Sequence, residues 1–201
     1  MAADALLRSL RHVWLLLEER GVPTALLGGL ALATWKHVRA TRDIDLLVGV
    51  GQDEVEDLLA YLGAAGIRPK RSPAITPLGE LAVIQLLYEP EEAFLDLQID
   101  LLLATSEYHQ EALRRRIPTQ LPELDVPLAV LTCEDLILHK LLAGRLIDRV
   151  DAATLLRANR PALDVKYLTD WAHRLGVEDE FVAVCREVFP GQPTDTGPGS
   201  P

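Results

Sequence analysis

The spacing of apolar residues near the start of the chain predicts a helix, a strand and a second helix. Apolar side chains recur every three or four positions over residues 2–20, as they do on one face of a helix. The short apolar run 25–27 is typical of a strand and leads directly into Gly28-Gly29. Segment 30–38 returns to helical spacing, so we expect a helix that begins at the two glycines.

The middle of the chain carries the strand patterns. Residues 44–48 form an apolar run typical of a strand, and residues 53–62 have helical spacing. Two longer apolar segments, 81–88 and 94–103, are separated by the acidic turn Glu89-Pro90-Glu91-Glu92. Because so short a turn reverses the chain, we expect these segments to form an antiparallel hairpin.

Helical spacing dominates the remainder of the chain. Residues 106–116 are expected to form a helix and residues 126–131 a short strand. Thr132 precedes a long helical stretch, and Asp135 three positions later gives the capping-box pattern of a helix start. The helical stretch reaches about residue 189, with breaks expected near residues 146–148, at Pro161 and at Gly176.

This order of elements predicts an α+β fold in which a mixed sheet is flanked by helices. We expect an α/β core over residues 1–131 and a helical C-terminal subdomain over 132–190 that closes a cleft. Segment 191–201, GQPTDTGPGSP, has nothing to bury and is expected to be a disordered tail.

The composition is that of an ordinary globular protein, with 201 residues of which 49% are hydrophobic and 25% charged. No stretch approaches the roughly 18 to 20 apolar residues that a membrane helix needs. The start of the chain lacks the basic and apolar segments of a secretory signal. Two cysteines, Cys133 and Cys185, are too few for a disulfide framework. We therefore expect a cytoplasmic protein that does not span a membrane.

The charge distribution bears on the partners. A net charge of −10 argues against broad binding to nucleic acid, which depends on basic surface. A local basic cleft is still compatible with that charge. We interpret the consecutive arginines 114–116 as a solvated helix end rather than a substrate clamp.

The motif Asp43-Ile44-Asp45 opens the apolar strand 44–48. Side chains alternate along a strand, so both carboxylates are expected on one face, opposite Ile44. Neighbouring carboxylates repel unless a cation lies between them, and Mg²⁺ prefers carboxylate and phosphate oxygens. The pair therefore indicates a metal site, the alternative being a turn beside a solvated strand edge.

Gly28 and Gly29 stand between a predicted strand and a predicted helix. Glycines there allow backbone N–H groups to approach a phosphate at a helix start. Taken alone, the pair is more typical of a tight turn without a ligand.

A third carboxylate is expected from the second strand of the hairpin. Alternation places Asp96, Gln98 and Asp100 on one face of residues 94–103. Asp100 lies in the more apolar part of the strand, whereas Asp96 is close to the turn. We therefore interpret Asp100 as the metal ligand and keep Asp96 as the alternative. Three carboxylates can hold two Mg²⁺ ions.

Together these motifs resemble the DNA polymerase β-like nucleotidyltransferase superfamily. The resemblance rests on Gly28-Gly29 at a helix start, on Asp43-Ile-Asp45 within a run from Arg39 to Val48, and on Asp100. The segment Glu134 to Asp151, which contains Lys140, is similar to the helical lysine motif of abortive-infection toxin-type nucleotidyltransferases.

The resemblance implies a nucleotidyltransferase fold and an enzyme that transfers a nucleoside monophosphate from a nucleoside triphosphate to an acceptor hydroxyl or phosphate. Asp43, Asp45 and Asp100 would bind two Mg²⁺ ions, with Mn²⁺ as a substitute. Gly28 and Gly29 would hold the β and γ phosphates. Thr41 and Arg42 would contact phosphate or shape the loop.

The roles of Lys140 and Asp151 have two interpretations each. Lys140 would reach the triphosphate, although a lysine beside an apolar stripe also snorkels without a ligand. Asp151 would orient Lys140 or a base, or it would be a carboxylate in the first turns of a helix.

The sequence leaves the acceptor open among a tRNA, a protein and a small molecule. A toxin-type enzyme would also have an antitoxin partner. The alternative function is a non-catalytic relative that binds nucleotide or a partner protein. A metal-dependent phosphohydrolase ranks last, because only His37 lies near the aspartates in the sequence.

Overall fold

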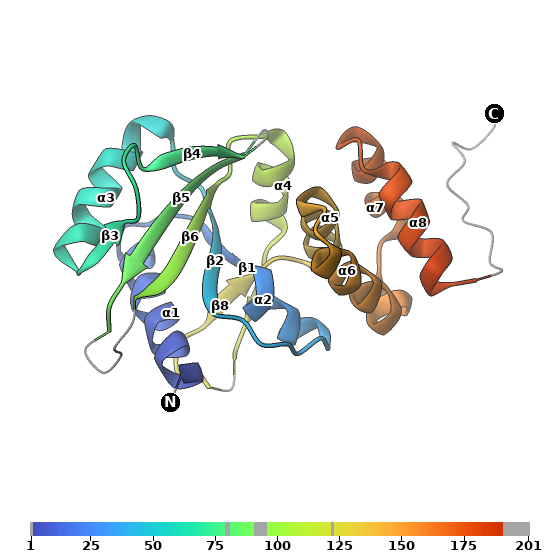
Figure 1. Cartoon of the computed structure of the whole chain (residues 1–201), viewed down its shortest axis with the longest axis horizontal. Coiled ribbons are helices and arrows are strands. Elements are labelled where there is room, and N and C mark those ends of the chain that lie inside the picture. Colours follow the sequence, from blue (N-terminus) through green and yellow to red (C-terminus); the bar gives the residue numbers. More distant parts are fainter. Residues whose placement is uncertain (1, 79–80, 91–95, 122, 191–201) are drawn as a thin grey trace. The chain divides into compact units, whose positions relative to one another are not determined.

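The computed structural model describes residues 2–78, 81–90, 96–121 and 123–190. The chain divides into two compact units (Figure 1). The first, here called the sheet unit, contains Met1–Thr34 and Val38–Leu131. The second, the helical unit, contains Trp35–His37 and the chain from Thr132 onward. The three residues Trp35–His37 thus belong to the helical unit, although the chain on either side of them belongs to the sheet unit.

One mixed sheet of eight strands forms the centre of the sheet unit within the described ranges. The strands run in the order β3-β5-β6-β2-β1-β8-β7, and β4 pairs with β5 (Figure 1). Their bounds are β1 Thr24–Leu27, β2 Asp43–Val48, β3 Ile67–Pro69, β4 Ile75–Leu78, β5 Leu81–Tyr88, β6 Leu97–Leu103, β7 Ile117–Thr119 and β8 Leu128–Val130. Strand β2 is antiparallel to β1 and parallel to β6, so the expectation of a mixed sheet is confirmed.

The helices of the sheet unit pack on this sheet. Helix α1 contacts β1 and β2, α2 contacts the same two strands, α3 contacts β3, and α4 contacts β2. Their bounds are α1 Ala2–Glu19, α2 Gly28–Ala31, α3 Val55–Ala64 and α4 Glu107–Arg115, with 3₁₀ turns at Leu32–Trp35 and Gln52–Glu54. The core between sheet and helices consists of fully buried aliphatic side chains, among them Leu17, Leu26, Leu46 and Ile84.

The helical unit is built from four helices that pack on one another. Helix α5 contacts α6 and α7, and α8 contacts α6 and α7. Their bounds are α5 Cys133–Ala143, α6 Leu146–Asn159, α7 Val165–Arg174 and α8 Glu178–Val188, with a 3₁₀ turn at Arg160–Ala162. All side chains of α5 from Cys133 to Leu141 are buried, the charged ones included.

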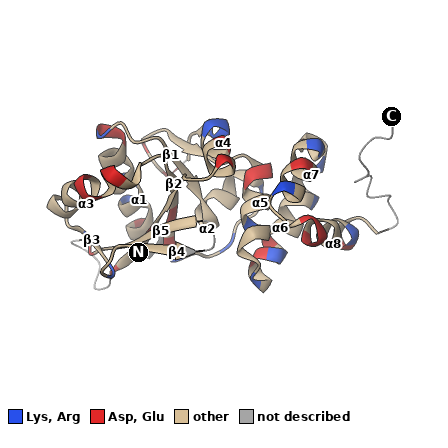
Figure 2. Ribbon diagram, turned by 90° about the horizontal axis from the view of Figure 1, so that it is seen from above, with Lys and Arg blue, Asp and Glu red and all other residues tan. Residues whose placement is uncertain are grey.

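Charged residues lie mainly on the helices and loops, and most of the sheet carries none (Figure 2). The aspartates of β2 and β6 are exceptions, because they are half-buried on strands whose neighbouring positions are aliphatic. Charge on a strand of this kind needs a reason other than solvation. None of the described helices combines the length and apolar content that crossing a bilayer requires.

Most of the predicted elements are confirmed. The strands β1, β2, β5 and β8 lie where they were expected, and β5 and β6 form the antiparallel hairpin. Thr132 caps α5, since its Oγ1 accepts a hydrogen bond from the backbone N–H of Asp135. The breaks at Pro161 and Gly176 are also present.

Some boundaries were wrong. The helix expected over 30–38 is a single α-turn followed by a 3₁₀ turn that ends at Trp35, because Lys36 adopts a left-handed conformation with φ of +63°. The break expected near 146–148 lies one turn earlier, since Gly144 ends α5 with φ of +65° and α6 already begins at Leu146. Part of the acidic turn (residues 91 and 92), the start of the expected strand (94 and 95), and the tail 191–201 lie outside the described residues.

Candidate active site

The three predicted carboxylates lie on two neighbouring strands. Because β2 and β6 are parallel and in register, Asp45 lies directly opposite Asp100, and Asp43 lies opposite Gln98. Asp43 and Asp45 are half-buried, whereas Ile44 between them is fully buried on the other face. Asp100 is likewise half-buried and stands between two fully buried aliphatic residues. The expected common face of carboxylates is therefore present.

Gly28 is required next to Asp45. Leu27, the last residue of β1, pairs with Asp45, so the glycine that follows lies beside the carboxylate. Gly28 has φ of +65°, and a Cβ atom added to it would lie 1.8 Å from Oδ2 of Asp45. Any other residue at this position would be strained and would displace the carboxylate.

Gly29 is required for a second close approach. A Cβ atom on Gly29 would lie 2.7 Å from the side chain of Thr41. Thr41 in turn donates a hydrogen bond from Oγ1 to Oδ1 of Asp43, at 2.5 Å. The glycine pair and the Asp-x-Asp motif therefore pack together: Gly28 leaves room for Asp45, and Gly29 leaves room for Thr41.

A chain of polar contacts orients Asp100. The side-chain amide of Gln98 donates to both carboxylate oxygens of Asp100, at 2.9 and 3.1 Å. Lys70 donates from Nζ to Oε1 of the same glutamine, at 2.6 Å. No local pattern in the sequence points to Lys70, because it follows a short strand distant in the chain. The structure therefore adds Lys70 and Gln98 to the residues around the carboxylates.

The pKa of Asp100 is raised above its usual value, and burial is the main cause. Hydrogen bonds from Gln98 and from Gln85 act in the opposite direction, and the charge of Asp43 adds to the upward shift. The ionised form of Asp100 is thus held at an energetic cost, which comes first from burial.

The alternative third carboxylate, Asp96, has a different environment. It makes an ion pair with Arg68 at 2.7 Å and is exposed. It precedes the segment of β6 that pairs with β2, so it does not face the carboxylates of β2 as Asp100 does. Arg42 is exposed, and the guanidinium of Arg39 donates to the carbonyl oxygen of Ala40. Binding of phosphate by Thr41, by Arg42 and by the backbone of Gly28 and Gly29 stays a prediction.

The residues around Asp45 fit a hard divalent cation by their chemistry. They supply carboxylate oxygens from adjacent strands, and Asp43 and Asp100 are close enough for the charge of one to raise the pKa of the other. As the side chains stand, however, no group of three or more His, Cys, Asp or Glu residues within the described part of the chain forms a ready set of metal ligands. Metal binding by Asp43, Asp45 and Asp100 therefore stays a prediction.

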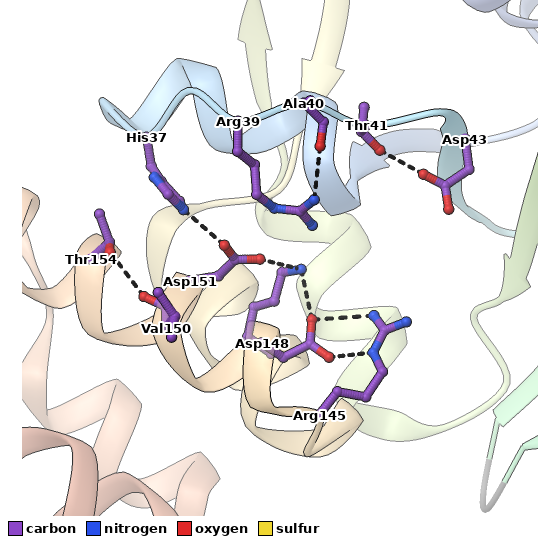
Figure 3. A network of polar contacts seen from close by, with 11 residues as sticks. His37, Arg39, Ala40, Thr41, Asp43, Arg145, Asp148, Val150, Asp151 and Thr154 are labelled. Atoms are coloured by element: carbon purple, nitrogen blue, oxygen red, sulfur yellow. Dashed lines mark hydrogen bonds and ion pairs between the residues drawn. The ribbon is translucent and has the colours of Figure 1, made fainter.

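In the helical unit, Lys140 lies in a buried cluster of charges. Its Nζ atom is 2.9 Å from Oδ1 of Asp148 and 2.9 Å from Oδ2 of Asp151, and all three side chains are at most 6% exposed. Arg145 makes two hydrogen bonds to Asp148, and His37 contacts Oδ1 of Asp151 at 2.8 Å (Figure 3). We call these five residues the Lys140 cluster. The interpretation that Asp151 orients Lys140 agrees with this contact.

The hairpin of α5 and α6 builds this cluster. Lys140 lies in the last turn of α5, Gly144 ends that helix in a left-handed conformation, and Asp148 and Asp151 lie one turn apart at the start of α6. Burial alone would raise the pKa of Asp148, but hydrogen bonds from Arg145 and Lys140 hold the pKa below its usual value. The cation of Lys140 is thus already countered by two carboxylates, and its contact with a triphosphate stays a prediction.

A hollow of about 560 Å³ opens at the other end of the central strands. Its lining includes Gly49, Thr105 and two of the consecutive arginines, Arg114 and Arg116. Gly49 directly follows β2, whereas Asp43 begins that strand. The hollow is therefore separate from the carboxylates. Arg114 and Arg115 lie in the last turn of α4, as the interpretation of a helix end predicted.

Comparison with known proteins identifies the family. Residues 1–188 match a family described as uncharacterised nucleotidyltransferase. The chain belongs to this nucleotidyltransferase family. No curated protein sequence matches it.

Solved structures show that this nucleotidyltransferase shares its fold with distant relatives. An antigenic nucleotidyltransferase-like protein from Paracoccidioides brasiliensis superposes with a TM-score of 0.53 at 14% identity, covering 94% of this chain and 98% of that one. The antibiotic-resistance factor ANT(2'')-Ia superposes with a TM-score of 0.54 at 15% identity, covering 93% and 98%. The expected nucleotidyltransferase fold is therefore confirmed.

Proposed function

We propose that this nucleotidyltransferase transfers a nucleoside monophosphate from a nucleoside triphosphate to a hydroxyl group, with Asp43, Asp45 and Asp100 as the metal-binding carboxylates. The single observation that carries the proposal is the direct pairing of Asp45 with Asp100 across two parallel strands. Two ionised carboxylates at such a position are stabilised by a divalent cation between them. The close fit of Gly28 against Asp45 supports the same conclusion, because it would fix the carboxylate at the start of a helix.

The transfer itself joins the acceptor oxygen to the α-phosphorus and breaks the bond between that phosphorus and the bridging oxygen, so that pyrophosphate leaves. Mg²⁺ bound at the carboxylates would lower the pKa of the acceptor hydroxyl and neutralise charge on the leaving group. Asp100 would accept the proton of the hydroxyl. Asp43 and Asp45 would remain ionised and hold the ion. Positioning and charge neutralisation supply most of the catalysis in such a reaction.

For the acceptor we propose a small molecule. The net charge of −10 disfavours a polyanionic acceptor such as tRNA, whose binding depends on basic surface. The similarity in fold to the antibiotic-resistance factor ANT(2'')-Ia extends over nearly the whole of both chains. A tRNA or a protein acceptor, as in toxin-type enzymes with an antitoxin, would be the other outcome of the test below. A non-catalytic nucleotide-binding protein would be the third.

The experiment is a transfer assay with label in the α-phosphate. Purified protein is incubated with Mg²⁺ and each of the four α-³²P-labelled ribonucleotides, with a panel of polyhydroxylated small molecules, with total tRNA or with a protein extract. We expect label on one of the small molecules, absent for Asp45→Asn and retained for Asp96→Asn. Label on tRNA or protein would overturn the acceptor class while leaving transfer intact. Metal-dependent nucleotide binding without transfer to any acceptor would favour the non-catalytic alternative.

A further inference from the structure

The segment Trp35–His37 lies between the two halves of the candidate site in the sequence. Gly28 and Gly29 precede it, and Thr41 and Asp43 follow it. The helical unit nevertheless contains these three residues, whereas Thr34 and Val38 belong to the sheet unit. The chain therefore leaves the sheet unit after the glycines and returns to it before the aspartates.

Two buried side chains of α6 hold this segment. The amide of Asn159 donates to the carbonyl oxygen of Trp35 at 2.9 Å, and Asn159 is 5% exposed. The carboxylate of Asp151 contacts Nε2 of His37 at 2.8 Å (Figure 3). Both contacts join residues more than a hundred positions apart in the chain.

The residue between these two contacts is strained. Lys36 has φ of +63°, a conformation that residues other than glycine rarely adopt. Among the described residues, no other residue except glycines has a positive φ. Its side chain is exposed. Strain of this kind persists where the surroundings determine the backbone, and here the flanking residues on both sides are the ones that α6 binds.

The Lys140 cluster explains why Asp151 can hold His37. One oxygen of Asp151 accepts from Lys140 and the other faces His37, so Lys140 fixes the orientation of the carboxylate. Lys140 is itself fixed by Asp148, which Arg145 holds from the exposed side. The cluster thus forms a rigid support for the imidazole of His37.

We propose that His37 and Asn159 are positioning residues for nucleotidyl transfer: they hold Trp35–His37 in the left-handed turn at Lys36 and thereby order the loop 38–42, which carries Thr41. Only residues 38–42 separate the clamped segment from Asp43, so fixing one end of this loop reduces the conformations open to Thr41, whose hydroxyl donates to Asp43. Lys140 acts in this account through Asp151. The effect on turnover rests on the proposed function, whereas the effect on the loop does not.

The test compares His37→Leu and Asn159→Leu with His173→Leu in the full chain. His173 also contacts a carboxylate, that of Glu178 at 2.7 Å, but the contact is exposed and lies in the α7–α8 turn. Amide hydrogen exchange is measured over residues 38–43. We expect faster exchange there in the two clamp variants and no change in the control. Under conditions where all variants are folded, kcat/KM for the labelled nucleotide should fall about 10- to 100-fold in the clamp variants alone. His37→Gln, whose amide can still donate to Asp151, should restore most of the protection.

The strain at Lys36 gives a second measurement that does not need activity. Lys36→Gly relieves the left-handed strain only while the clamp enforces it. In the wild-type background, Lys36→Gly should therefore raise the melting temperature more than it does in the double variant His37→Leu/Asn159→Leu. Equal shifts in both backgrounds, together with unchanged exchange over 38–43, would overturn the clamp even if nucleotide transfer is intact. Faster exchange without any detectable transfer would leave the clamp standing and contradict the proposed function instead.

Discussion

Asp45 on β2 and Asp100 on β6 are direct register partners in a parallel pair of strands, and both carboxylates lie on the same face of the sheet. Neighbouring acidic side chains in register repel each other. The pKa of Asp100 is raised, first by burial and further by the charge of Asp43. This arrangement costs the folded protein stability, and a cation at the proposed metal site would offset that cost.

The first prediction concerns Asp100→Asn. The substitution removes a buried carboxylate whose pKa is raised, so at neutral pH it should increase the free energy of unfolding. It should also lower nucleotide transfer by at least about 100-fold, because a group that stabilises the transition state is lost. Urea unfolding and the labelled-nucleotide assay measure the two effects.

Asp96→Asn is the control for this variant. It breaks only the ion pair with Arg68 and should leave transfer unchanged. Loss of transfer in Asp96→Asn together with normal transfer in Asp100→Asn would show that the wrong carboxylate has been assigned.

The second prediction concerns Gly28→Ala, with Gly21→Ala as a matched control. Both glycines have φ of +65°, but a Cβ atom at Gly21 meets nothing within 4 Å, whereas at Gly28 it meets Asp45. We expect Gly21→Ala to cost about 1–2 kcal/mol from backbone strain alone. Gly28→Ala should cost about 2–5 kcal/mol, because overpacking adds to the strain.

Nucleotide binding should separate these two glycine variants further. Gly28→Ala displaces Asp45 and should abolish metal-dependent binding of nucleotide, while Gly21→Ala should bind as the wild type does. Isothermal titration with MgATP and the other three nucleotides measures this. Equal loss of binding in both variants would indicate a general effect of unfolding rather than a local one.

The third prediction concerns Lys140→Met. Loss of the ammonium leaves the buried carboxylates of Asp148 and Asp151 without one of their cations. Breaking a buried ion pair from one side costs about 3–5 kcal/mol, so the variant should unfold at much lower urea concentration. Lys166→Met, in an exposed pair with Asp170, should change stability little. Normal stability with weakened triphosphate binding in Lys140→Met would instead support Lys140 as a nucleotide ligand.

The fourth prediction concerns acid sensitivity. Burial lowers the pKa of His109 from 6.5 to about 4. The unfolded chain therefore binds a proton at pH values where the folded protein does not, and stability is lost as the pH falls from about 6.5 to 4. The full loss amounts to about 3 kcal/mol at 1.36 kcal/mol per pKa unit.

The comparison of wild type with His109→Leu isolates this effect. The difference in unfolding free energy between the two should change by about 3 kcal/mol between pH 7 and pH 4, and be constant above pH 7. Parallel pH profiles for His109→Leu and wild type would contradict the assignment of a neutral buried imidazole.

Strand alternation was enough to predict that Asp43 and Asp45 share one face of their strand and that Gln98 and Asp100 share one face of theirs, because that property depends only on a period of two. That the two faces coincide follows from the register of β2 and β6, which only the structure gives. The hairpin followed from two long apolar runs. Three strands were missed, namely β3, β4 and β7, and each of them contains a proline. Proline cannot donate a hydrogen bond within a sheet and is confined to edges, which is where these strands lie. Short edge strands of this kind carry no clear pattern.

The contacts that join distant parts of the chain could not be predicted. The Lys140 cluster is partly visible in the sequence. Lys140 lies near the end of one helical segment, Gly144 follows it, and Asp148 and Asp151 lie one turn apart in the next segment. The contact of His37 with Asp151 has no such signal, because 114 positions separate the two residues. Only the tertiary fold brings them together. The same holds for Lys70, which reaches Gln98 from another strand end.

The most direct test of the central claim is a titration of the protein with Mn²⁺, followed by the electron paramagnetic resonance signal of the free ion. The titration is made in the presence of non-hydrolysable α,β-methylene analogues of the four nucleoside triphosphates. We expect wild type and Asp96→Asn to bind the ion tightly with one of the analogues. Asp45→Asn and Asp100→Asn should lose this binding while remaining folded. Binding of Mn²⁺ by Asp45→Asn with unchanged affinity would show that the paired carboxylates of β2 and β6 are not the metal site.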